Sequence, residues 1–286
     1  MNYNSAAELR AFLEKNGLGM RKKYGQNFLI NPGARQTLAN ALDAGAGEAV
    51  WEIGPGLGAM TSLLLERGLP VRAFEIDSGF ARALRELFAG NANFTLIEGD
   101  VLKTWHDHPP APYLLGNLPY NIAATLLAGL IEQGRLFRRM VVTVQREVAQ
   151  RMAAAPGSAD YSSFSVLCAS AYRVKPLMVI KSASFYPRPN VDSQGVLLEL
   201  RDDAAPALPS VFYPLVRQLF SSRRKTVKNN LAGFIGTRQG LGQKPPVALA
   251  GEALERCAIS GGRRAEECAL EDFISLAKVI EDMGIS

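Results

Sequence analysis

From about residue 49 onward the chain alternates short apolar runs with longer amphipathic segments, and this alternation constrains the fold more than any other feature. Short apolar runs bounded by turn residues predict buried strands, and the segments between them have the length and periodicity of helices. Strands that alternate with helices form a mostly parallel sheet with helices on its faces, so we predict an α/β fold. The predicted strands span 49–53, 69–75, 93–98, 113–117, 139–145 and 173–180, and the predicted helices about 59–67, 78–89, 122–133 and 146–154.

The rest of the chain has a different pattern. A last strand at 195–200 is expected to return antiparallel at an edge of the sheet. The stretch 201–210 has the Pro, Ala and Ser content of a linker. Beyond it the sequence has helical periodicity and no good strand, in segments at 211–220, 225–235, 245–256 and 270–283.

Composition excludes several classes of protein. Of the 286 residues, 48% are hydrophobic and 21% charged, which supports a large core and excludes wholesale disorder. The three cysteines form no CxxC pair, so we expect neither a disulfide scaffold nor a zinc ribbon. His106 and His108 have no third ligand nearby in the sequence, so we expect no metal site. No apolar run is long enough for a bilayer span, and the N-terminus lacks the layout of a signal peptide. We therefore expect a cytoplasmic protein with no membrane partner.

A glycine-rich loop, EIGPGLGA at 52–59, joins the first predicted strand to a helix. Gly54 and Gly56 let the backbone turn tightly and approach a ligand. The loop fits the dinucleotide fingerprint, and it also fits the E-x-G-x-G-x-G loop of methyltransferases that use S-adenosyl-L-methionine (AdoMet). Glu75, at the end of the next strand, suits either cofactor, since both present a ribose diol to a carboxylate. A plain strand-to-helix turn is a third interpretation.

Two further sites lie after the third and fourth predicted strands. Asp100 can accept a hydrogen bond from an adenine amine, or it is simply a turn residue. The sequence Asn-Leu-Pro-Tyr at 117–120 is more informative, because side chains at the carboxyl ends of parallel strands open onto the ligand crevice. Pro119 lacks an N–H and stiffens the turn, which leaves the Leu118 carbonyl free to face the site. Tyr120 offers a ring for a base to stack on, worth about 1–3 kcal/mol.

This arrangement can methylate an exocyclic adenine amine, a poor nucleophile whose lone pair is delocalised into the ring. The Asn117 side chain and the Leu118 carbonyl would accept its two N–H bonds and aim the lone pair at a sulfonium methyl group. The close, in-line placement of the amine and the dispersal of the sulfonium charge during transfer then account for the rate of methylation, and no side-chain base is strictly needed. A second transfer has only one N–H left to hold. An ordinary turn with a buried tyrosine is the competing interpretation.

The motifs taken together resemble the small-subunit ribosomal RNA adenine dimethyltransferases, over about residues 20–232. They are RKKYGQNFL (21–29), EIGPGLGAMT (52–61), FEID (74–77), GD (99–100), GNLPYNI (116–122), QREVAQRMAAAPGSADYSSFSV (145–166), FYPRPNVDS (185–193) and FSSRRKTVKNNL (220–231). The resemblance implies a Rossmann-like, seven-stranded AdoMet-dependent methyltransferase fold with a small C-terminal helical domain. It also implies dimethylation of two adjacent adenosines near the 3′ end of small-subunit (16S) rRNA, and a role in ribosome biogenesis.

The resemblance also implies roles for parts of the chain. Residues 1–45 would cover the cofactor, 46–200 would form the AdoMet-binding catalytic domain, and 201–286 a small helical RNA-binding domain. Tyr120 and Phe185 would bracket the flipped adenine, with Asn117, Leu118 and Pro119 completing the catalytic set. The AdoMet contacts carried over are Asn27, Leu29, Gly54, Gly56, Glu75, Ile76, Asp100, Val101 and Asn117.

The chain departs from the family pattern at a few positions. Asn31 stands where Asp is common, Ala123-Ala124 where Ser-Thr is common, and Arg188 and Asn190 interrupt a Pro-rich run. None of these positions is a residue to which the resemblance assigns a catalytic or AdoMet-binding role. The departures therefore bear on details of substrate recognition and not on the chemistry.

Basic residues without nearby acids in the sequence predict phosphate contacts. The net charge is +5, and no Asp or Glu occurs in 161–191 or 204–251. The first window holds Arg173, Lys175, Lys181 and Arg188. From the second we predict that Arg223, Arg224, Lys225 and Lys228 bind RNA or help to orient the C-terminal domain; a solvated helix face is the alternative. The expected partner is small-subunit rRNA or an immature 30S particle, and we expect a monomer.

Three alternatives stay open at this point. One is a methyltransferase of a large-subunit rRNA adenine, which would share the pocket motifs, although 185–193 and 220–231 favour the small-subunit enzyme. Another is a non-catalytic ribosome-assembly factor, against which the intact 117–120 motif and Glu75 argue. The third is a dehydrogenase.

Overall fold

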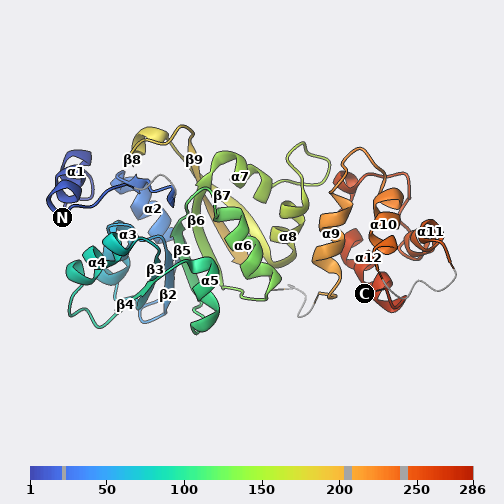
Figure 1. Ribbon diagram of the computed structural model, residues 1–286, viewed down its shortest axis with the longest axis horizontal. Helices are drawn as coiled ribbons and strands as arrows, with labels where there is room; N and C mark the ends of the chain where they lie inside the picture. The colour runs from blue at the N-terminus through green and yellow to red at the C-terminus, as the bar shows by residue number, and fades with distance from the viewer. Residues whose placement is uncertain (21–23, 203–207, 239–243, 286) are drawn as a thin grey trace. The chain divides into compact units, whose positions relative to one another are not determined.

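The structure is a computed structural model that describes residues 1–20, 24–202, 208–238 and 244–285 (Figure 1). It divides into two compact units. The sheet unit comprises Met1–Ala149 and Arg173–Leu200, and the helical unit comprises Gln150–Tyr172 and Arg201–Ser286. Arg21, Lys22 and Lys23 of the motif at 21–29 and residues 203–207 of the predicted linker lie outside the described residues.

A seven-stranded sheet organises the sheet unit, in the order β4-β3-β2-β5-β6-β9-β7. The pairs β2/β3, β3/β4, β2/β5 and β5/β6 are parallel, while β6 and β9 are antiparallel. The α/β fold predicted from the sequence is therefore confirmed. The strands are β2 (Val50–Ile53), β3 (Val71–Glu75), β4 (Phe94–Glu98), β5 (Tyr113–Asn117), β6 (Arg139–Gln145), β7 (Tyr172–Ile180) and β9 (Ser193–Leu200).

The strand order reverses at β2, whose neighbours β3 and β5 both run parallel to it. Chain connections leave in opposite directions at such a point, and a crevice opens beyond the carboxyl ends of the strands. Ile53, Glu75 and Asn117 are the last residues of these three strands. The topology thus gathers the residues that the sequence analysis singled out.

The position predicted for the last strand is wrong. β9 is antiparallel as expected, but it lies between β6 and β7, and β7 forms the edge of the sheet. Burial explains the order: residues 195–198 of β9 are all buried, which suits a central strand. β7 carries exposed residues such as Arg173, Lys175 and Pro176, which suit an edge.

The helices predicted at 59–67, 78–89, 122–133 and 146–154 are all present, and their bounds agree with the prediction to within about two residues. Asn31 caps α2, because its side chain accepts a hydrogen bond from the N–H of Ala34, as Asp would. The helices are α1 (Ala6–Lys15), α2 (Pro32–Leu42), α3 (Ala59–Glu66), α4 (Ser78–Leu87), α5 (Val101–Thr104), α6 (Ala123–Glu132) and α7 (Arg146–Met152), whose last turn belongs to the helical unit.

A small second sheet holds the N-terminal segment in place. β1 (Phe28–Leu29) pairs antiparallel with β8 (Phe185–Tyr186), two elements that the sequence did not reveal. Leu29 and Phe185 are direct partners in this pairing and both belong to the apolar core under α2. In Figure 1, β8 accordingly lies beside the N-terminal segment.

The helical unit has its own apolar core, built by Phe212, Phe234 and Phe273 among others. The domain limits carried over from the resemblance need a correction, because residues 150–172, assigned there to the catalytic domain, belong to this unit. Tyr161 is buried in its core and donates a hydrogen bond to the Cys268 carbonyl at 3.1 Å. The helices are α8 (Ser163–Ala171), α9 (Phe212–Leu219), α10 (Val227–Gly236), α11 (Pro246–Arg256) and α12 (Leu270–Asp282). Within the described parts of both units, no helix has the length and apolar content to cross a membrane.

Candidate cofactor and methyl-transfer site

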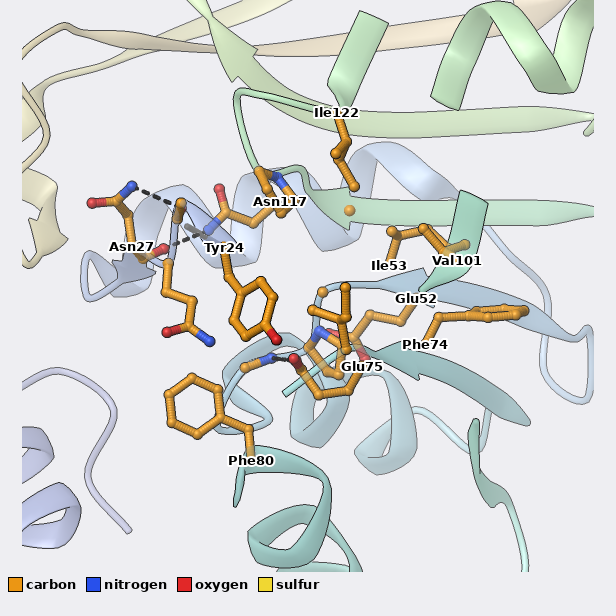
Figure 2. A pocket seen from close by; sticks show the side chains of 18 of the residues that line it. Tyr24, Asn27, Glu52, Ile53, Phe74, Glu75, Phe80, Val101, Asn117 and Ile122 are labelled. Atoms are coloured by element: carbon orange, nitrogen blue, oxygen red, sulfur yellow. Dashed lines mark hydrogen bonds between the residues drawn. The ribbon is translucent and has the colours of Figure 1, made fainter. Parts of the chain in front are cut away.

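A cavity of about 270 Å³ lies where the carboxyl ends of β2, β3, β4 and β5 meet (Figure 2). It is the crevice that the reversal of strand order predicts. All the residues proposed as AdoMet contacts line it: Asn27, Leu29, Gly54, Gly56, Glu75, Ile76, Asp100, Val101 and Asn117.

The glycine loop forms one wall of the cavity. Gly54 and Gly56 have φ values of +69° and +59°, a region in which side chains are strained. A Cβ atom on Gly56 would lie 2.8 Å from Cε1 of Phe28, so the N-terminal segment packs directly on the loop. Phe28 itself lines the cavity, a role that the sequence analysis missed.

Glu75 is held in a fixed orientation at the end of β3. Its Oε2 accepts the N–H of Gly56 at 3.1 Å and its Oε1 accepts the N–H of Asp77 at 2.9 Å. The residue is only 4% exposed, and burial raises its pKa to about 7 in spite of these donors. Each oxygen keeps a lone pair, which suits the two hydroxyls of a ribose diol.

Glu52 is a second buried carboxyl group in the cavity, and the sequence analysis did not assign it to the site. Its Oε2 accepts the Thr61 hydroxyl at 2.7 Å. Burial raises its pKa to about 7, and the nearby charge of Glu75 acts in the same direction. A glutamate inside a strand that is otherwise apolar is the signal that could have found it, since a buried charge is costly without a partner.

Asp100 fits both interpretations left open by the sequence. Its Oδ1 caps α5 by accepting the N–H of Leu102 at 3.0 Å, while the residue also lines the cavity. Ile76 is 40% exposed and Val101 is buried, and together they give the cavity apolar surface beside this carboxylate. Apolar walls with one acceptor suit a purine ring that carries an amine.

Asn117 is joined to the N-terminal segment. Its Nδ2 donates to the Asn27 carbonyl at 2.7 Å, and Asn27 in turn donates to the Gly25 carbonyl at 3.1 Å (Figure 2). Because this contact uses the amide nitrogen, Oδ1 is the atom left to accept a hydrogen bond from a substrate. Tyr24, from the same segment, is another cavity residue that the sequence analysis missed.

The rest of the 117–120 motif is divided between the cavity and its surroundings. Pro119 lines the cavity, whereas the side chain of Leu118 is buried outside it. The Leu118 N–H donates to the Thr143 carbonyl, and the Leu118 carbonyl accepts no hydrogen bond from the described residues. Tyr120 is half-buried outside the cavity, and its hydroxyl lies 2.7 Å from Oγ of Ser193.

Phe185 is not brought to the site. The residue is 3% exposed and packs in the apolar core, where its strand pairs with Leu29. Its ring therefore presents no free face with which to bracket an adenine in this conformation. The pairing of β1 with β8, which the sequence did not reveal, is the reason.

The charge of the cavity separates the two cofactors between which the glycine loop could not decide. None of the described residues that line it is Lys, Arg or His, and two of them are the buried carboxyl groups of Glu52 and Glu75. Such a cavity disfavours the pyrophosphate of a dinucleotide and favours a cation. AdoMet carries a positive sulfonium, a ribose diol and an adenine amine, and each finds a suitable group here. The fold and the site together define an AdoMet-dependent methyltransferase.

Comparisons with known proteins identify the family. The family model described as "Ribosomal RNA adenine dimethylase" matches residues 17–280. The ribosomal RNA small subunit methyltransferase A of Treponema denticola is 46% identical, over 98% of this chain and 96% of its own length. The protein of the same name from Geobacter sulfurreducens is 38% identical, over 92% and 95%. The chain belongs to the ribosomal RNA adenine dimethylase family, and it is an rRNA adenine dimethyltransferase.

Solved structures agree with this assignment. The dimethyladenosine transferase of Plasmodium falciparum has a TM-score of 0.77 at 28% identity, and the match covers 89% of this chain and 98% of that one. The 23S rRNA methyltransferase ErmE has a TM-score of 0.63 at 21% identity, over 88% and 99%, and shows the shared fold alone. The dehydrogenase and the non-catalytic assembly factor are therefore set aside.

The basic residues predicted to bind RNA have different surroundings in the helical unit. Arg223 is tied to the protein, because its Nε donates to Glu266 at 3.0 Å and a terminal nitrogen donates to the Ala159 carbonyl at 3.1 Å. Arg224 and Lys225 are exposed, and their side chains have no partner among the described residues. The lack of acids in the sequence window did not foresee Glu266, which comes from far along the chain.

Lys228 is half-buried, and its aliphatic stem packs beside Gly251 and Gly261. Its ammonium group is therefore positioned by the helical unit, whereas Arg224 and Lys225 are exposed and have no partner among the described residues.

Proposed function

We propose that this chain dimethylates the exocyclic amines of two adjacent adenosines near the 3′ end of small-subunit (16S) rRNA, with an immature 30S particle as its partner. Relatives that share 37–46% identity over nearly the full length are named ribosomal RNA small subunit methyltransferase A. Their names support the small subunit as the target. The large-subunit alternative is supported only by the fold of ErmE.

The geometry of Asn117 carries the proposed chemistry. Its Nδ2 is engaged by the Asn27 carbonyl, so its Oδ1 is available to accept one N–H of the target amine. The unpaired carbonyl of Leu118 would accept the other N–H, and the two contacts favour a pyramidal nitrogen with a localised lone pair. When bound, AdoMet supplies a methyl group on a positively charged sulfur. Holding the amine in line with that methyl carbon is then the main task of the protein.

The second methylation makes a smaller demand on these acceptors. A monomethylated amine has one N–H left, so either Oδ1 of Asn117 or the Leu118 carbonyl is enough to orient it. The ring of Tyr120 is proposed to stack on the extruded base and to offset part of the few kcal/mol that extrusion costs.

The test is transfer of tritiated methyl groups to undermethylated small ribosomal subunits, followed by mass spectrometry of the nucleosides. We expect N6,N6-dimethyladenosine at two adjacent positions, and loss of at least about a hundredfold in rate for Asn117→Ala, as for removal of an oxyanion-hole donor. Large-subunit rRNA is the control substrate. Methylation of that RNA in preference to small subunits would overturn the proposal.

A further inference from the structure

The loop of residues 181–192, which joins β7 to β9 and contains β8, leads directly into Ser193, the first residue of β9. The hydroxyl of Ser193 lies 2.7 Å from that of Tyr120. Ser193 is fully buried, so the position of the tyrosine is coupled to this loop. An RNA strand whose adenine reaches Tyr120 must therefore pass near the loop.

Asp192 organises the polar contacts of the loop. Its carboxylate accepts Nζ of Lys181 and the N–H of Ser182, both at 2.9 Å, and these hydrogen bonds lower its pKa. Its carbonyl accepts the N–H of Arg146, the first residue of α7, at 3.2 Å. The hydroxyl of Ser182 accepts Nε of Arg188 at 3.0 Å. One aspartate thus connects two arginines from separate elements.

The charges in this cluster do not cancel. The charge of Lys181 is balanced by its ion pair with Asp192. Arg146 and Arg188 are both exposed, and neither guanidinium forms an ion pair with a described residue. Among the described residues Arg188 donates only through Nε, so its two terminal nitrogens are available as a fork. One positive charge, that of Arg188, therefore lies on the loop that leads to Ser193, and a second, that of Arg146, whose N–H donates to Asp192 of the loop, lies at the start of α7.

We propose that Arg146 and Arg188 bind the phosphodiester groups next to the target adenosine, an inference that rests on the proposed function. Guanidinium forks match the geometry of phosphate oxygens, and a base can stay extruded only if its backbone is held. Both arginines belong to the sheet unit, so these contacts are distinct from the predicted contacts of the helical unit.

The experiment measures binding of undermethylated small subunits over a series of salt concentrations. The affinity constant K falls as salt rises, and each lost phosphate contact reduces the magnitude of the slope of log K against log salt by about 0.7–0.9. We expect Arg188→Ala and Arg146→Ala each to lower the slope by that amount and to weaken binding about tenfold, which is about 1.4 kcal/mol. Arg188→Lys should keep the slope and lose part of the affinity, because an ammonium group lacks the fork.

Arg82→Ala is the matched control, since Arg82 is an exposed arginine of α4 with no described partner. AdoMet affinity by calorimetry should stay unchanged in every variant, which reports an intact cavity. Slopes for Arg188→Ala and Arg146→Ala equal to that of Arg82→Ala would overturn the inference. If the wild type methylated only large-subunit rRNA, the proposed function would be wrong, and the same slopes on that RNA would still decide the phosphate contacts.

Discussion

Among single residues, Glu52 and Glu75 dominate the energetics of the cavity. Burial raises the pKa of each to about 7, above the ordinary value of 4.5. Between these values the folded protein binds more protons than the unfolded chain, so the stability of the cofactor-free protein falls as pH rises through this window. AdoMet binding has the opposite dependence, because a sulfonium cation favours the ionised carboxylates.

We therefore predict that Glu52→Gln changes stability and binding in opposite directions. Above about pH 7 the cofactor-free variant should be more stable than the wild type, by up to about 3 kcal/mol, because no buried charge has to form. Its AdoMet affinity should be lower at the same pH. Thermal unfolding and calorimetry across the pH range measure both. If the variant were instead less stable than the wild type above neutral pH, the ionised carboxylate of Glu52 would be stabilised by the cofactor-free protein, and the prediction would be wrong.

Two substitutions of Tyr120 test whether its aromatic ring or its hydroxyl group contributes to RNA methylation. Tyr120→Ala should lower RNA turnover by about tenfold or more, since stacking is worth about 1–3 kcal/mol, and should leave AdoMet binding unchanged. Tyr120→Phe keeps the ring and removes only the contact with Ser193, so it should retain most of the activity. Equal losses of turnover and of AdoMet affinity in Tyr120→Ala would mean that the ring is structural.

At the scale of elements, the N-terminal segment is a wall of the cofactor cavity. Phe28 packs on the glycine loop, the Asn27 carbonyl orients Asn117, and β1 pairs with β8. Gly56→Ala should therefore weaken AdoMet binding by more than about tenfold, because the new Cβ displaces the Phe28 ring and the φ value is strained. Gly68→Ala is the matched control: its φ is +73°, but no atom lies within 4 Å of the new Cβ. Equal AdoMet affinities in the two variants would contradict the packing argument.

At the scale of the whole molecule, the two units have separate cores, and two of the exposed cations on the helical unit are Arg224 and Lys225. The double variant Arg224→Ala/Lys225→Ala should lower the salt slope of RNA binding by about 1.5 and leave thermal unfolding unchanged. Arg223→Ala should instead lower the unfolding temperature, because Arg223 holds Glu266 and the Ala159 carbonyl. An unchanged slope in the double variant would remove these residues from the RNA-binding surface.

The elements with strong periodicity could be predicted from the sequence almost to the residue, for example β5, β6 and the helices of the C-terminal part. The two-residue strands β1 and β8 could not, because strands of that length carry no periodicity and depend on their partner. The order of β9 and β7 also depended on burial on both faces, which is a property of the assembled sheet.

By itself the sequence determined which residues meet at the cavity, because Glu75, Asp100 and Asn117 end or follow parallel strands whose carboxyl ends converge. The glycine loop by itself left the cofactor open, and the tertiary structure added a separate argument for AdoMet: a second buried carboxyl group at Glu52, and the lack of basic residues among the described residues that line the cavity. The tertiary structure also places Phe185 in the apolar core and pairs Arg223 with Glu266. The physical reason is the same in each case: burial and charge pairing are set by residues distant in the chain, which a local pattern does not contain.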